Sequence, residues 1–140
     1  MNPAPEYNRS PLSPQDASSA QARRRARLLD RTDLPHSAIA YEVEGDDRGG
    51  HGGRGASVIV VDAPPGSGPM LHKHPYAEIF VVLEGQATFT AGEEVIEAVG
   101  GQVVVVPAGV PHTFVNAGTG PLRQVDIHPS GRLITEWLED

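Results

Sequence analysis

The feature that most constrains this chain is a series of short apolar segments, each closed by glycine or proline. The longest apolar runs have four or five residues, as in Val103–Val106. The segments are rich in Val, Ile, Phe and Thr and recur roughly every ten residues, which is typical of a β-sandwich or barrel. The predicted strands are 39–44, 56–62, 78–84, 86–90, 93–98, 102–106, 112–116 and 122–128.

The first 32 residues have a different composition, rich in Pro, Ser, Ala and Arg and almost without apolar side chains before Leu28. Such a segment buries too little surface to offset the entropy lost on ordering. We therefore predict an N-terminal extension over 1–32, disordered over 1–13 and weakly helical over 14–30. The folded domain is predicted over 33–140.

Charge and composition exclude several classes of function. Residues 1–32 carry six arginines against three acidic residues, whereas residues 33–140 carry five basic and fifteen acidic residues. A domain with a net charge near −10 is unsuited to binding nucleic acid, which needs clustered Lys and Arg. The absence of cysteine excludes disulfides and thiolate chemistry. No apolar run is long enough to span a membrane or to form a signal peptide, so we expect a cytoplasmic protein without a membrane partner.

Four side chains stand at spacings that suit a metal site. His72 and His74 have the same parity, so in an extended chain they point to one face. Glu78 opens an apolar strand, where a carboxylate without a partner is costly, and His112 opens another strand after Pro111. Three imidazoles and one carboxylate suit a divalent transition metal (Fe, Mn, Ni, Zn or Cu) better than Ca or Mg.

Two longer motifs contain these residues. The stretch GSGPMLHKHPYAE over 66–78, continuing to Gly85, resembles the first cupin motif, and GQVVVVPAGVPHTFVN over 101–116 resembles the second. The resemblance implies an all-β double-stranded β-helix, the cupin or jelly-roll barrel, with a metal near one mouth. It maps the metal ligands onto His72, His74, Glu78 and His112. Gly85 and Gly109 are expected at turns that need a positive φ.

Other residues have two possible roles each. Tyr76 either binds a substrate at the barrel mouth or caps a strand. His128 either lines the barrel as a proton carrier or lies at an exposed strand end before Pro129, which we favour. Of Arg123 and Gln124, only one can face inward. Three phenylalanines are expected in the core rather than stacked on a substrate: Phe80, Phe89 and Phe114.

We expect a metal-dependent enzyme acting on a small organic molecule, with a dioxygenase-like oxidoreductase favoured. The candidate catalytic residues are Glu78, Tyr76 and His128. A cyclase or isomerase, or a barrel that binds a small molecule or metal without catalysis, remains open. A homodimer is expected, because 39–44 is a predicted edge strand and the segment 134–138, read as a helical turn or extended arm, exposes apolar side chains including Trp137.

Overall fold

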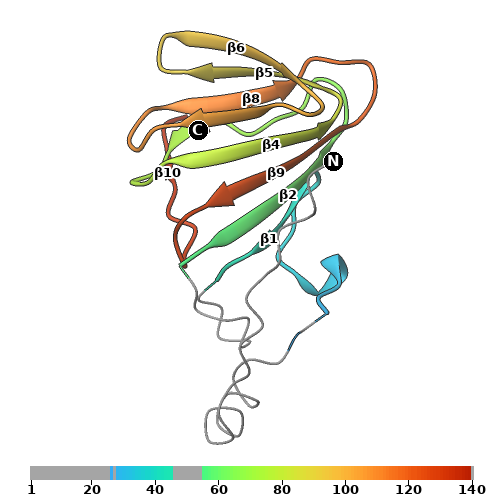
Figure 1. The fold of residues 1–140 in the computed structure, drawn as a ribbon, viewed down its shortest axis with the longest axis vertical. Coiled ribbons are helices and arrows are strands. Elements are labelled where there is room, and N and C mark those ends of the chain that lie inside the picture. Colours follow the sequence, from blue (N-terminus) through green and yellow to red (C-terminus); the bar gives the residue numbers. More distant parts are fainter. Residues whose placement is uncertain (1–25, 27, 46–54, 140) are drawn as a thin grey trace, which may run out of the picture.

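A computed structural model describes residues 26, 28–45 and 55–139 (Figure 1). Within these residues the chain forms one 3-10 turn and ten strands, so the all-β prediction is confirmed. All eight predicted strands are present, with ends that differ by one residue at most. The elements are η1 (Arg31–Asp33), β1 (Ala40–Val43), β2 (Ser57–Ala63), β3 (His72–Lys73), β4 (Glu78–Glu84), β5 (Gln86–Ala91), β6 (Glu94–Val99), β7 (Val103–Val106), β8 (His112–Asn116), β9 (Leu122–His128) and β10 (Glu136–Trp137).

Two antiparallel five-stranded sheets face each other (Figure 1). The first sheet has the order β1-β2-β9-β4-β7 and the second has the order β10-β3-β8-β5-β6. Neighbours such as β2 and β9 are distant in sequence, so the sheets are closed by long-range pairing. This is the jelly-roll arrangement expected from the two motifs, and β1 is an edge strand as predicted.

Alternation along the strands places one apolar layer between the sheets. Phe80 from the first sheet meets Phe89 and Phe114 from the second, with ring centroids 4.9 and 6.1 Å apart. All three rings are buried, which confirms their place in the core. On β9, Gln124 is fully buried and Arg123 is exposed, so the glutamine is the inward residue.

The outer face of the first sheet is also apolar. Paired residues form two rows that each cross all five strands, and neither row contains a charged side chain. At the β7 edge Val103 and Val105 are 57% and 58% exposed. The rows are Val43, Val58, Ile127, Ile79 and Val105, and Tyr41, Val60, Val125, Val81 and Val103.

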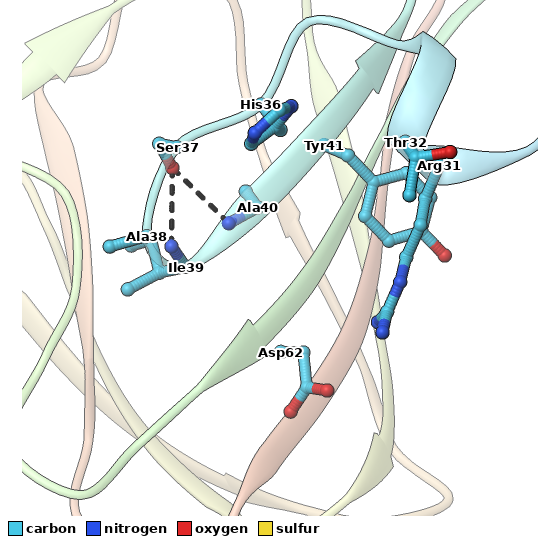
Figure 2. A pocket seen from close by; sticks show the side chains of 9 residues that line it. All are labelled: Arg31, Thr32, His36, Ser37, Ala38, Ile39, Ala40, Tyr41 and Asp62. Carbon is cyan, nitrogen blue, oxygen red and sulfur yellow. Dashed lines mark hydrogen bonds between the residues drawn. The ribbon is translucent and has the colours of Figure 1, made fainter.

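The segment just before β1 lies between two hollows and contributes residues to the lining of both. Its outer side bounds a hollow of about 330 Å³ beside Arg31, Tyr41 and Asp62 (Figure 2). The Ser37 hydroxyl accepts hydrogen bonds from the backbone N–H groups of Ile39 and Ala40, and this holds the turn into β1 (Figure 2). The same turn lines an inner cavity described below.

The secondary structure predicted for the two ends of the chain can be compared with the structure only in part. The disorder and the weak helix predicted for the N-terminal extension lie largely outside the described residues, and residues 28–30 are not helical. At the C-terminus the structure shows the extended arm and not the helical turn of the two predicted alternatives, because Glu136 and Trp137 form strand β10 beside β3. No helix in the described part of the chain is long and apolar enough to span a membrane.

Two glycines hold the backbone that presents the site. Gly85, between β4 and β5, has a φ of 95°, and a Cβ there would lie 2.5 Å from the Pro121 carbonyl oxygen. A Cβ on Gly68 would overlap the Phe114 carbonyl. The loop before His72 therefore approaches β8 as closely as only glycine allows. Gly109 has the positive φ expected from the motif.

Candidate metal centre

The four predicted ligands meet between the two sheets. His72 on β3 lies opposite His112 on β8, and His74 directly follows β3, so the second sheet and the residue after its strand β3 supply three imidazoles. Glu78 opens β4 and supplies the carboxylate from the first sheet. One ligand atom from each residue lies within 4.8 Å of all the others, and all four residues are buried. The arrangement has the size of a coordination shell for one ion.

Backbone carbonyls determine which nitrogen of each histidine faces the cluster. The Nδ1 atoms of His72, His74 and His112 lie 2.7, 2.7 and 2.9 Å from the carbonyl oxygens of Met70, Ile134 and Val110. A carbonyl oxygen only accepts hydrogen bonds, so in each case Nδ1 carries the proton and donates it. The Nε2 lone pairs are left for a metal, with ring orientations set by the supporting hydrogen bonds.

The contacts of Glu78 indicate a missing positive charge. Its Oε1 lies 2.9 Å from His74 Nε2 and 3.1 Å from His112 Nε2. With both Nδ1 atoms protonated, two neutral imidazoles would direct lone pairs at an anionic oxygen. His74 Nε2 is buried without a well-aligned hydrogen bond among the described residues. Either extra protons or a cation must lie between these atoms, and a divalent ion fits the donor set.

His128 and Tyr76 hold the other carboxylate oxygen. His128 Nε2 lies 3.0 Å from Glu78 Oε2, a close contact without well-aligned hydrogen-bond geometry, and His128 Nδ1 lies 2.7 Å from the Tyr76 hydroxyl. The Ile134 N–H donates to that hydroxyl at 3.3 Å, so the hydroxyl proton is available for His128 Nδ1. His128 then carries its own proton on Nε2, which faces Glu78. The three candidate ligand histidines are the other tautomer, with the proton on Nδ1.

The expectation that His128 lies at an exposed strand end is therefore wrong. The side chain is 1% exposed and points between the sheets, because position 128 shares the inward parity of Gln124 on β9. Tyr76 does not merely cap a strand, since its hydroxyl completes the chain of contacts from Ile134 to Glu78.

Burial and the neighbouring groups shift the pKa values of the cluster. Burial lowers the pKa of His72 to about 4, so this ring is neutral at neutral pH. Burial alone would raise the pKa of Glu78, but its close contacts with His112, His128 and His74 outweigh burial and hold that pKa well below its usual range. Glu78 is therefore an anion, as a metal ligand must be.

The cluster borders a cavity of about 470 Å³, a volume within the range of small-molecule sites. His72, His74 and Glu78 contribute to its wall, together with apolar side chains such as Phe80 and Ile59. No Lys or Arg is among the described residues that line it. A bound ion would thus face a space that can hold a small organic molecule.

Comparison with known proteins identifies the family. The Cupin domain family matches residues 59–128, which is half of the chain and contains all four ligand positions as well as His128. The chain is a cupin. The region that matches begins in β2 and ends with β9, so it includes the four candidate metal ligands and most of the cavity wall.

Two uncharacterized proteins resemble this cupin in sequence. Uncharacterized protein MJ1618 of Methanocaldococcus jannaschii is 38% identical over 68 residues, which are 48% of this chain and 54% of that protein. Uncharacterized protein SCO3923 of Streptomyces coelicolor is 36% identical over 61 residues, which are 44% of this chain and 58% of that protein. The matched region thus spans little more than half the length of each relative.

Solved structures of Bacillus subtilis oxalate decarboxylase share the fold. One, from a study of the enzyme's Mn(II) centres, has a TM-score of 0.66 and 21% identity, covering 75% of this cupin and 29% of that chain. A second, determined at pH 4.6, has a TM-score of 0.65 with the same identity and coverage. At this identity the likeness concerns the fold alone.

One functional candidate was missed by sequence reasoning. Asp126 on β9 is 3% exposed and lines the cavity of this cupin between the parity-matched residues Gln124 and His128. The alternation of inward positions 124, 126 and 128 was the available signal, since a carboxyl that faces the space between the sheets needs an explanation.

Proposed function

We propose that this cupin is a metal-dependent enzyme that acts on a small organic molecule held in the inner cavity. One observation carries the proposal: the three imidazoles and the carboxylate gather beside a cavity of about 470 Å³ rather than in a closed shell. A structural metal site is usually closed, whereas a catalytic one keeps a position for substrate. Four protein ligands in an octahedral shell leave two such positions.

We propose a single divalent transition metal from the group Fe, Mn, Ni, Zn and Cu, held by His72, His74, Glu78 and His112. When bound, such an ion polarises a coordinated oxygen or orients two reactants. The Nδ1 contacts to backbone carbonyls support the metal role, because they orient the rings before an ion arrives. The Mn(II) centres of the structurally similar oxalate decarboxylase make manganese a first choice for reconstitution.

We favour an oxidoreductase of the dioxygenase type, with an isomerase or cyclase as the second candidate. The apolar part of the cavity wall, which includes Ile59, Phe80 and Phe114, suits an organic substrate shielded from water. The second candidate is favoured by the contacts from Tyr76 through His128 to Glu78. These groups hold exchangeable protons next to the cavity, as proton-transfer chemistry requires.

Elemental analysis followed by oxygen uptake tests the proposal. Protein purified without chelators should carry about one divalent transition metal per chain, and a Glu78→Gln variant should carry much less while staying folded. With a set of enolisable small molecules, oxygen consumption that tracks metal content supports the dioxygenase. Conversion without oxygen consumption supports the isomerase or cyclase. A folded protein that takes up none of Mn, Fe, Ni, Zn or Cu would contradict the enzyme reading.

We also propose a homodimer formed by the outer face of the first sheet. Ten uncharged side chains form two rows on this face, bordered at one end by the charged residues Asp62, Arg123 and Glu84, although the domain as a whole is strongly acidic. A second copy is the partner that presents an equally flat, uncharged surface, and sheets pack face to face about 10 Å apart. Trp137 lies outside this face, because β10 belongs to the second sheet, where the Trp137 ring is 5.0 Å from the His72 ring and is 57% exposed.

Light scattering tests the dimer with two matched variants. Val60→Glu places a charge at the centre of the face and should give a folded monomer. Trp137→Ser should leave the dimer intact, because that side chain lies on the second sheet, outside the proposed face. A monomeric parent at tens of micromolar would contradict the proposal, and dissociation by Trp137→Ser alone would move the interface to the C-terminal segment.

A further inference from the structure

Asp126 is a buried carboxyl in a place where an apolar residue would be expected. It lies on β9 opposite Ile59 on one neighbouring strand and Phe80 on the other, and its side chain is 3% exposed. Its carboxyl lines the cavity that borders the metal cluster, although Asp126 is not one of the four clustered ligands. Burying such a group without a full set of partners is costly, so a ligand-binding role is a physical reason to have it here.

Gln124 holds one carboxyl oxygen and leaves the other free. Gln124 Nε2 donates to Asp126 Oδ1 at 2.8 Å from a fully buried position. Among the described residues no other side chain hydrogen-bonds to the Asp126 carboxyl, so Oδ2 remains for a molecule in the cavity. A proton on this carboxyl would therefore lie on Oδ2.

The charges around Asp126 disfavour its anion. Burial raises the pKa of Asp126 well above its usual range, the Glu78 charge raises it further, and the Gln124 hydrogen bond opposes these effects only in part. Glu42, which also lines the cavity, has a pKa raised by burial and by Glu44. His128 is the nearest basic group along β9, and its Nε2 faces Glu78.

We propose that Asp126 is a substrate-binding residue that donates a hydrogen bond from Oδ2 to a carbonyl or hydroxyl oxygen of an uncharged molecule. The substrate class is then a neutral oxygenated compound, such as a hydroxy-ketone or enol. Dicarboxylates are disfavoured, because no Lys or Arg among the described residues of the wall could pair with a second carboxylate group. This inference rests on the proposed function for the metal cluster and deepens it.

Calorimetric titration of the metal-loaded protein tests this role without requiring turnover. The probes are maltol, an uncharged hydroxy-ketone, and oxalate, a dianion that likewise offers two adjacent oxygens. The parent should bind maltol more tightly than oxalate. Asp126→Asn keeps both a donor and the acceptor for Gln124, so it should bind maltol within about threefold of the parent. Asp126→Leu removes both the donor to maltol and the acceptor for Gln124, so it should weaken maltol binding about tenfold or more.

The controls separate this inference from the proposed function. Metal content is measured in every sample, and the titrations are repeated on metal-free protein. A failure to bind metal or to turn over a substrate would then contradict the proposed enzymatic function without contradicting the binding role of Asp126. If Asp126→Leu does not fold, Asp126→Ala provides the same loss of the carboxyl without added volume. The inference is overturned if the apolar variant binds maltol as tightly as the parent, if the parent prefers oxalate, or if the fully loaded parent binds neither probe.

Discussion

His128→Phe should weaken metal binding although His128 is not one of the four clustered ligands. The substitution keeps a ring of similar size in a site that is 1% exposed, but it removes the Nε2–H that faces Glu78 Oε2 at 3.0 Å. Glu78 would then lose the contact that keeps its other oxygen, Oε1, directed at His74 and His112. Loss of such a supporting contact typically costs about 10- to 100-fold in metal affinity, or about 1.4–2.7 kcal/mol.

The same change should also lower the stability of the metal-free protein. A buried contact to a charged group contributes about 1.5–3 kcal/mol, and for a chain of this size that corresponds to a loss of roughly 5–10 °C in melting temperature. Competition with a coloured chelator measures the affinity, and thermal unfolding in EDTA measures the stability.

Tyr76→Phe is the matched control for this experiment. It removes only the hydroxyl that contacts His128 Nδ1 at 2.7 Å and leaves the imidazole beside Glu78. Its effect on metal affinity should therefore be smaller than that of His128→Phe. Metal affinity within twofold of the parent in His128→Phe would refute the reasoning, because it would show that Glu78 is oriented without this side chain.

Two further changes have predicted outcomes. Folding raises the pKa of Asp126 above its unfolded value of 3.8, so the folded chain keeps a proton that the unfolded chain releases, and this group's contribution to stability falls as pH rises above about 4. Asp126→Asn cannot titrate, so its melting temperature relative to the parent should rise between pH 4 and pH 7; a constant difference would contradict a raised pKa. Deletion of residues 1–25 should leave melting temperature and metal affinity unchanged, whereas deletion of 1–38 should lower both, because it removes buried Leu34 and the cavity-lining Ser37 and Ala38. Equal effects of the two deletions would contradict the boundary near residue 33.

Much of the fold could be predicted from the sequence because it rests on local signals. Eight of the ten strands are marked by β-branched residues between glycines and prolines, whereas β3 and β10, with two residues each, have no such signal. The period of two along a strand fixes which side chains share a face. The shared parity predicted that His72 and His74 face the same side, and the motif spacing predicted Glu78 and His112 as further ligands. In the structure one ligand atom from each of these four residues lies within 4.8 Å of the others. These inferences needed no knowledge of which strands are neighbours.

The support around the cluster depends on pairing between distant segments and was hidden from the sequence. His74 donates to the carbonyl of Ile134, sixty residues later, and Tyr76 reaches His128 only because β9 lies beside β4. The sequence left the C-terminal segment as either a helical turn or an extended arm, since its pairing with β3 has no local sequence signal.

The sequence by itself determined the strands, the facing of alternate residues and the set of candidate ligands, because these follow from backbone geometry and side-chain chemistry along a few residues. Only the tertiary structure decided that His128 is buried, that Asp126 faces the cavity and that ten apolar side chains align across one outer face. Those features depend on sheet order and cross-strand register, which arise from contacts between residues far apart in the chain.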